Sequence, residues 1–112
     1  KALHWFKKAA ASGGSNAREF LDDADTINDI GEAYFNGDGI TKDHAAAFIY
    51  FMEAANKGST DAQYSVGWCY YTGTGVSEDN QQALYWCERA ASNGNYDARE
   101  LLQEIKEYLS NN

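Results

Sequence analysis

Residues 30–43 read IGEAYFNGDGITKD, and residues 66–79 read VGWCYYTGTGVSED, 36 positions later. Glycine, tyrosine and aspartate stand at the same places in both stretches. Comparison of residues 30–62 with residues 66–98 gives 11 identities in 33 positions. Repetition at a fixed period is typical of proteins built from stacked copies of one structural unit. We therefore expect a repeat protein.

The N-terminus carries a third, partial copy of the pattern. Trp5, the Ala9-Ala10 pair and Gly13 match residues 86, 90–91 and 94 at a shift of 81, nine residues more than two periods of 36. We therefore predict an insertion at the first junction. Because the chain starts at Lys1 inside an expected helix, we also expect a piece cut from a longer array. The predicted single domain covers 1–112: a partial repeat at 1–20, an insertion at 21–29, repeats at 30–65 and 66–94, and a C-terminal capping helix at 95–112.

Each repeat is predicted to be a pair of antiparallel helices. The chain has no proline, and its turns are built from glycine, asparagine, serine and threonine instead. Asp43 and Asp79 each follow a Gly-x-Gly turn and precede an alanine-rich run, which is where a helix N-cap is needed. Gly31 and Gly67 stand inside expected helices despite a propensity cost of roughly 1 kcal/mol, which indicates a close helix crossing. No stretch shows the alternation of a strand, so the predicted class is all-α.

The spacing Gly31-x-x-Tyr34-x-x-Gly37-x-Gly39, present again 36 residues later, resembles the Sel-1-like repeat, a relative of the tetratricopeptide repeat. The resemblance implies an α/α superhelix: a right-handed solenoid of antiparallel helical hairpins. It also implies a non-enzymatic scaffold for protein–protein interaction, often in signalling. The last helix departs from the pattern, with Gln103 and Lys106 in place of the glycine and tyrosine. Such a departure suits a terminal cap whose outer face meets water.

The chain is acidic, and this narrows its partners. Nine basic residues against 17 acidic ones leave a net charge of −8 at pH 7. Proteins that bind nucleic acid or anionic membrane surfaces need clustered lysine and arginine, so neither class of partner is expected. No apolar run approaches the ~18–20 residues of a membrane span, so no membrane insertion is expected.

The predicted contact surface centres on three aromatic residues of one expected helix. Tyr64, Trp68 and Tyr71 are spaced i, i+4 and i+7, and the opposite face carries Ala62, Val66, Cys69 and Tyr70. If the first helices of successive hairpins line one side, the equivalent positions join this surface. The surface then consists of Asn28, Glu32, Phe35, Tyr64, Trp68, Tyr71, Glu100, Glu104 and Glu107, of which all but Asn28 are the predicted partner-binding residues.

Aromatic anchors beside carboxylates suit a peptide or protein segment that carries basic residues next to apolar ones. Three alternatives stay open. The rings of Tyr64, Trp68 and Tyr71 pack sideways against adjacent helices, as we expect of Trp5, Tyr50 and Trp86; or they stack on a glycan such as a cell-wall sugar; or the N-terminal half-repeat drives self-association.

The sequence offers no set of catalytic or metal-ligating residues. Cys69 and Cys87 lack a metal-ligand spacing and are expected to be buried free thiols, which favours a reducing, cytoplasmic location. His4 and His44 belong to different helices without a nucleophile or base beside them. The acidic run at 22–29 lacks the glycine and the glutamate of a calcium loop. We therefore predict neither an enzyme nor a cofactor.

Overall fold

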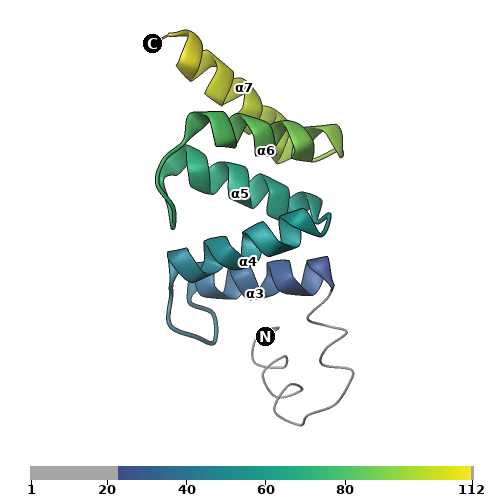
Figure 1. Ribbon diagram of the computed structural model, residues 1–112, viewed down its shortest axis with the longest axis vertical. Coiled ribbons are helices and arrows are strands. Elements are labelled where there is room, and N and C mark those ends of the chain that lie inside the picture. Colours follow the sequence, from purple (N-terminus) through teal and green to yellow (C-terminus); the bar gives the residue numbers. More distant parts are fainter. Residues whose placement is uncertain (1–22, 112) are drawn as a thin grey trace.

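The computed structural model describes residues 23–111 and contains five α-helices in that range. They are α3 (Ala24–Asn36), α4 (His44–Asn56), α5 (Thr60–Thr72), α6 (Asn80–Ser92) and α7 (Tyr96–Ser110). The helices lie one above another along the long axis of the molecule, in chain order from α3 to α7 (Figure 1). The described part of the chain has no β-strand, and the predicted all-α class is confirmed.

Each helix begins where a side chain caps the free amides of its first turn. Asp43 Oδ1 accepts a hydrogen bond from the Ala46 amide at 3.0 Å, and Asp79 Oδ1 accepts one from Gln82 at 3.1 Å, as predicted. The first helices α3 and α5 end at Gly37 and Gly73, which have φ values of 71° and 70°. This left-handed conformation carries little steric cost in glycine, so the turn after each first helix depends on it.

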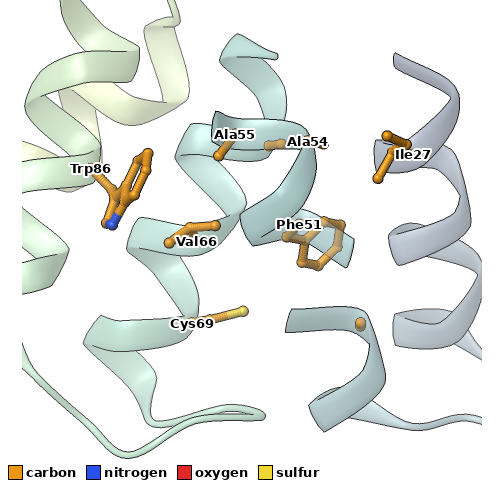
Figure 2. Packing of buried hydrophobic residues seen from close by; sticks show 9 residues of the cluster. Ile27, Phe51, Ala54, Ala55, Val66, Cys69 and Trp86 are labelled. Atoms are coloured by element: carbon orange, nitrogen blue, oxygen red, sulfur yellow. The ribbon is translucent and has the colours of Figure 1, made fainter. Parts of the chain in front are cut away.

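The core consists of small residues where helices cross and larger ones between hairpins. Ala47 and Ala54 of α4 and Ala83 and Ala90 of α6 are fully buried. Figure 2 shows the main cluster, in which Ile27 of α3, Phe51 of α4, Val66 of α5 and Trp86 of α6 take part. A continuous core thus joins one hairpin to the next, as stacked repeats require.

The predicted insertion at 21–29 needs correction. Asp23 caps α3 by accepting a hydrogen bond from the Thr26 amide at 3.2 Å, so residues 24–29 form the first turns of this helix. Ile27 is 1% exposed and belongs to the core. The sequence comparison missed this because only Asp25 of residues 24–29 has an identical partner 36 positions later. Residues 21 and 22 of the predicted insertion lie outside the described residues. So does the partial repeat predicted at 1–20, with His4 and Trp5.

The two glycines inside first helices mark the closest helix contacts. A Cβ atom on Gly67 would lie 2.6 Å from Cys87 Sγ, and one on Gly31 would lie 2.7 Å from Cδ1 of Phe51. Carbonyl oxygens of α6 and α4, those of Ala83 and Ala47, would lie within 3.4 and 3.3 Å of the same two positions. A side chain at either glycine would therefore push the two helices of one hairpin apart, as the sequence predicts.

Substitution of Gly67 by alanine should destabilise the protein. The gain in helix propensity is about 1 kcal/mol, but overpacking against Cys87 costs about 1–3 kcal/mol, so we expect a net loss of up to about 2 kcal/mol. Urea unfolding followed by circular dichroism measures the change. Glu88→Ala, an exposed change within α6, is the control and should stay within about 0.5 kcal/mol of the parent. Cys87→Ala should make the Gly67→Ala change less costly; an equal cost in both backgrounds would contradict this contact.

Candidate functional site: two pockets on the face of α3, α5 and α7

Helix α5 has a small-residue buried face and an aromatic face. Ala62 and Val66 are fully buried and Cys69 is 1% exposed, whereas Tyr64, Trp68 and Tyr71 are half-buried. Three of the four residues predicted on the opposite face are thus buried, and the fourth, Tyr70, is half-buried. The aromatic face looks toward the neighbouring first helices, α3 on one side and α7 on the other, and each side contains a pocket.

The first pocket, named here the α3–α5 pocket, has a volume of about 390 Å³. Its walls come from the aromatic face of α5 and from the equivalent face of α3, and Phe51 of α4 adds a further ring. The lining residues are Glu32, Phe35, Asn36, Phe51, Tyr64, Ser65, Trp68 and Cys69.

The second pocket, the α5–α7 pocket, has a volume of about 260 Å³. It shares Tyr64 and Trp68 with the first, so the two pockets adjoin across α5. Carboxylates from α7 form much of its wall. The lining residues are Tyr64, Trp68, Tyr71, Thr72, Asp97, Glu100, Leu101 and Glu104.

Seven of the eight predicted partner-binding residues line one of these pockets, and Glu107 is the exception. Glu107 Oε1 accepts a hydrogen bond from Gln103 Nε2 at 3.1 Å on the exposed side of α7. Asn28, placed on the same surface by the sequence, is only 5% exposed. Its Nδ2 donates to Glu32 Oε2 at 3.4 Å, so Asn28 supports the rim of the α3–α5 pocket instead of lining it.

The aromatic walls are held by contacts between rings. Phe35 lies edge-on to Trp68, with ring centroids 5.6 Å apart and planes at 72°, and stacks on His44 at 4.6 Å. Tyr71 lies edge-on to Tyr108 of α7 at 6.2 Å. Sideways packing, the alternative left open by the sequence, is therefore part of the arrangement. These contacts restrict the rings while leaving Tyr64, Trp68 and Tyr71 half-exposed to the pockets.

The charged side chains that line the two pockets are all acidic. Burial, followed by repulsion from Asp29, raises the pKa of Glu32 above its usual value, and the hydrogen bond from Asn28 partly offsets this rise. Burial and the charge of Asp97, with smaller effects of Glu104 and Glu100, raise the pKa of the Tyr64 hydroxyl.

The pKa of Tyr71 is raised as well, by burial and by its hydrogen bond with Glu104. Neither set of lining residues contains a lysine, arginine or histidine.

Sequence reasoning missed several lining residues, among them Phe51 and Asp97. Phe51 belongs to α4, a second helix, and a helical wheel drawn on the first helices does not include it. Asp97 lies at the start of α7, close to Tyr64. It occupies the position equivalent to Asp61 of the preceding repeat. That repeated aspartate was the available signal.

The cysteines offer no chemistry to the pockets. Cys69 and Cys87 are buried free thiols, and burial raises the pKa of Cys69 to about 11 and that of Cys87 to about 12. Both stay protonated at neutral pH and are poor nucleophiles. Within residues 23–111 no three histidine, cysteine or acidic side chains are grouped so that they could hold a metal ion. No helix in this range has the length and apolar character needed to cross a membrane.

The chain is similar in structure to Sel1-like repeat (SLR) proteins of known structure. The Sel1 repeat protein from Oxalobacter formigenes shares 32% identity at a TM-score of 0.75, over 92% of this chain and 27% of that one. A protective antigen of uropathogenic Escherichia coli strains with an SLR fold shares 31% identity at a TM-score of 0.70, over 86% of this chain and 19% of that one. Helicobacter pylori cysteine rich protein B shares 31% identity at a TM-score of 0.70, over 79% of this chain and 65% of that one.

The chain thus spans less than two thirds of each of these proteins. No curated protein sequence matches it significantly.

A family model described as Sel1 repeat matches residues 1–14, 24–59 and 60–95. The second and third matches correspond to the hairpins α3–α4 and α5–α6, and each begins at the first residue of a first helix. The repeat units therefore start six residues earlier than the sequence comparison placed them, at 24 and 60 instead of 30 and 66. The matches cover most of the chain, which belongs to the Sel1 repeat family.

Proposed function

We propose that the face formed by α3, α5 and α7 binds a protein segment that carries basic residues beside apolar ones. Sel1 repeat proteins are generally protein-interaction scaffolds and form a family of non-catalytic repeats. The observation that carries the proposal for this chain is the pair of adjoining pockets. Together they are lined by seven of the eight predicted residues and by four carboxylates, with no cationic side chain among them.

Desolvation of aromatic rings and attraction between opposite charges both favour such a partner. Tyrosine and tryptophan bury much apolar area and lose little conformational entropy on binding, so they are frequent anchors of interfaces. Here the rings of Phe35, Trp68 and Tyr71 are already held by their neighbours, which lowers the ordering cost of a partner. The surrounding carboxylates favour lysine and arginine and disfavour acidic segments.

The test uses a random peptide library displayed on phage, selected against the parent protein. Peptides that it enriches are synthesised, and their Kd is measured by fluorescence polarisation. Tyr71→Ala should weaken binding by at least about tenfold, because it removes an aromatic anchor at the pocket wall. Tyr85→Ala on α6 is the matched control: Tyr85 is 50% exposed and lines neither pocket, so its loss should leave Kd unchanged.

Circular dichroism and thermal unfolding must show that the Tyr71→Ala protein is folded. If it is not, Glu104→Gln, an exposed change on α7, takes its place in the comparison. Equal affinities of the Tyr71→Ala and Tyr85→Ala proteins for the selected peptides would place the binding face elsewhere. Failure to enrich any peptide, together with binding of cell-wall oligosaccharides, would favour the glycan alternative.

Binding should depend on pH through Glu32. Its raised pKa means that the carboxylate takes up a proton at a higher pH than an ordinary glutamate does, and the charge that attracts a basic partner is then lost. Affinity should therefore fall as the pH is lowered from 7 through the raised pKa. Glu32→Gln should show weaker binding at pH 7 and a smaller change on acidification. Identical pH profiles for the two proteins would remove Glu32 from the site; Glu88→Gln on α6 is the control.

A further inference from the structure

The two pockets lie on opposite sides of one helix and differ in chemistry. Tyr64 and Trp68 of α5 belong to both linings and form the ridge between them. A segment that crosses this ridge reaches both pockets. If the two linings favour different side chains, they also select the order in which those side chains occur along the bound segment.

The α3–α5 pocket is mainly apolar. Phe35, Phe51, Trp68 and Cys69 supply rings and a protonated thiol, and the pKa of Cys69, raised to about 11, keeps that thiol uncharged. Glu32 is the one carboxylate in the lining. A pocket of about 390 Å³ with such walls has room for an aromatic or large aliphatic side chain.

The α5–α7 pocket is acidic. Asp97, Glu100 and Glu104 line it together, and Tyr64 and Tyr71 add hydroxyl groups whose pKa values are raised partly by these carboxylates. Leu101, which is 8% exposed, and Trp68 provide apolar surface along which the stem of a long side chain can lie. Charge complementarity therefore selects an arginine or lysine side chain for this pocket.

The spacing of the two side chains follows from helix geometry. Pockets on opposite sides of one helix are separated by about 10 Å, the diameter of a helix with its side chains. An extended chain advances about 3.3 Å per residue and a polyproline II helix about 3.1 Å, so about three steps along the chain cover this distance.

We propose that the two pockets are subsites for one extended protein segment. An aromatic or large aliphatic side chain occupies the α3–α5 pocket, and an arginine or lysine about three residues away occupies the α5–α7 pocket. The inference rests on the proposed function and adds the order of the apolar and the basic side chain along the bound segment.

Synthetic ten-residue peptides in a glycine–serine background test the order. One set places phenylalanine and arginine three residues apart, in both directions along the chain; a second set places them six residues apart. A third replaces arginine by citrulline, which keeps the shape of the side chain and removes its charge. Binding is followed by amide NMR titration up to millimolar peptide. The best peptide of the first set should bind about three- to tenfold more tightly than its citrulline form or the six-residue spacing.

The protein variants assign each side chain to its pocket. Glu100→Gln with Glu104→Gln should weaken binding of the arginine peptide about three- to tenfold and leave the citrulline peptide within about twofold. Ser65→Phe, which fills the α3–α5 pocket, should weaken both peptides alike. Circular dichroism establishes that each variant is folded, and Gln81→Glu, an exposed change on α6 that lines neither pocket, is the matched control.

The results separate this inference from the proposed function. Equal affinity for arginine and citrulline peptides, or equal loss of both in the Glu100→Gln, Glu104→Gln protein, would overturn the assignment of the acidic subsite. Absence of binding by every designed peptide, while library peptides bind in a Tyr71-dependent way, would overturn the two-subsite order and leave the proposed function standing. Absence of binding by both kinds of peptide would overturn both.

Discussion

Close contact between the two helices of each hairpin is the constraint on which the rest of the molecule depends. Gly31 and Gly67 leave no room for a side chain, because Phe51 and Cys87 of the facing helices occupy that space. The alanines of α4 and α6 at these crossings are fully buried. Small residues on both sides fix the distance between the helices and the rotation of each first helix about its axis.

That rotation determines what the first helices present to their surroundings. With the small-residue face of α5 turned toward its own hairpin partner and the core, Tyr64 and Trp68 emerge on the side between α3 and α7. There these large side chains line the pockets between α5 and the corresponding faces of the neighbouring repeats. The pockets are therefore a consequence of repeat stacking, in which each wall belongs to a different repeat.

The composition of these walls varies from repeat to repeat while the packing positions stay the same. Asn28, Tyr64 and Glu100 occupy equivalent positions in α3, α5 and α7, and they are respectively buried, half-buried and exposed. A shared scaffold thus carries a different side chain at each step of the groove. The gradient from rings at α3 and α5 to carboxylates at α7 arises from this variation and gives the surface its direction.

Most of the fold could be predicted from the sequence because the repeat encodes it in a few residue types. The glycines, the capping aspartates Asp43 and Asp79, and the period of 36 residues all correspond to features of the structure. The start of α3 could not be predicted in this way, since residues 24–29 resemble 60–65 at Asp25 alone. Ile27 is buried in the core although its residue type differs from that of its counterpart 36 positions later, and a count of identical residues does not detect shared burial.

The sequence predicted most residues on the surface of the candidate site, but not those that reach it from other helices or lie beneath it. Helical spacing placed the three rings of α5 and the glutamates Glu100 and Glu104 of α7 on one face, and all of them line the pockets. It placed Glu107 there too, which lines neither pocket. It did not include Phe51, which reaches the pocket from a second helix, nor the burial of Asn28 beneath Glu32. Contacts between elements decide both, and the periodicity of one helix carries no information about them.

The proposed binding surface is the face formed by α3, α5 and α7. The most direct measurement is the NMR map of a library-selected peptide bound to isotope-labelled protein, with intermolecular nuclear Overhauser effects from its side chains. With the peptide on this face, these effects should reach the ring protons of Phe35, Trp68 and Tyr71, and the exposed residues of α4 and α6 should keep their chemical shifts. Contacts centred on Tyr85 and Arg89 of α6, with the rings of α5 undisturbed, would contradict this assignment.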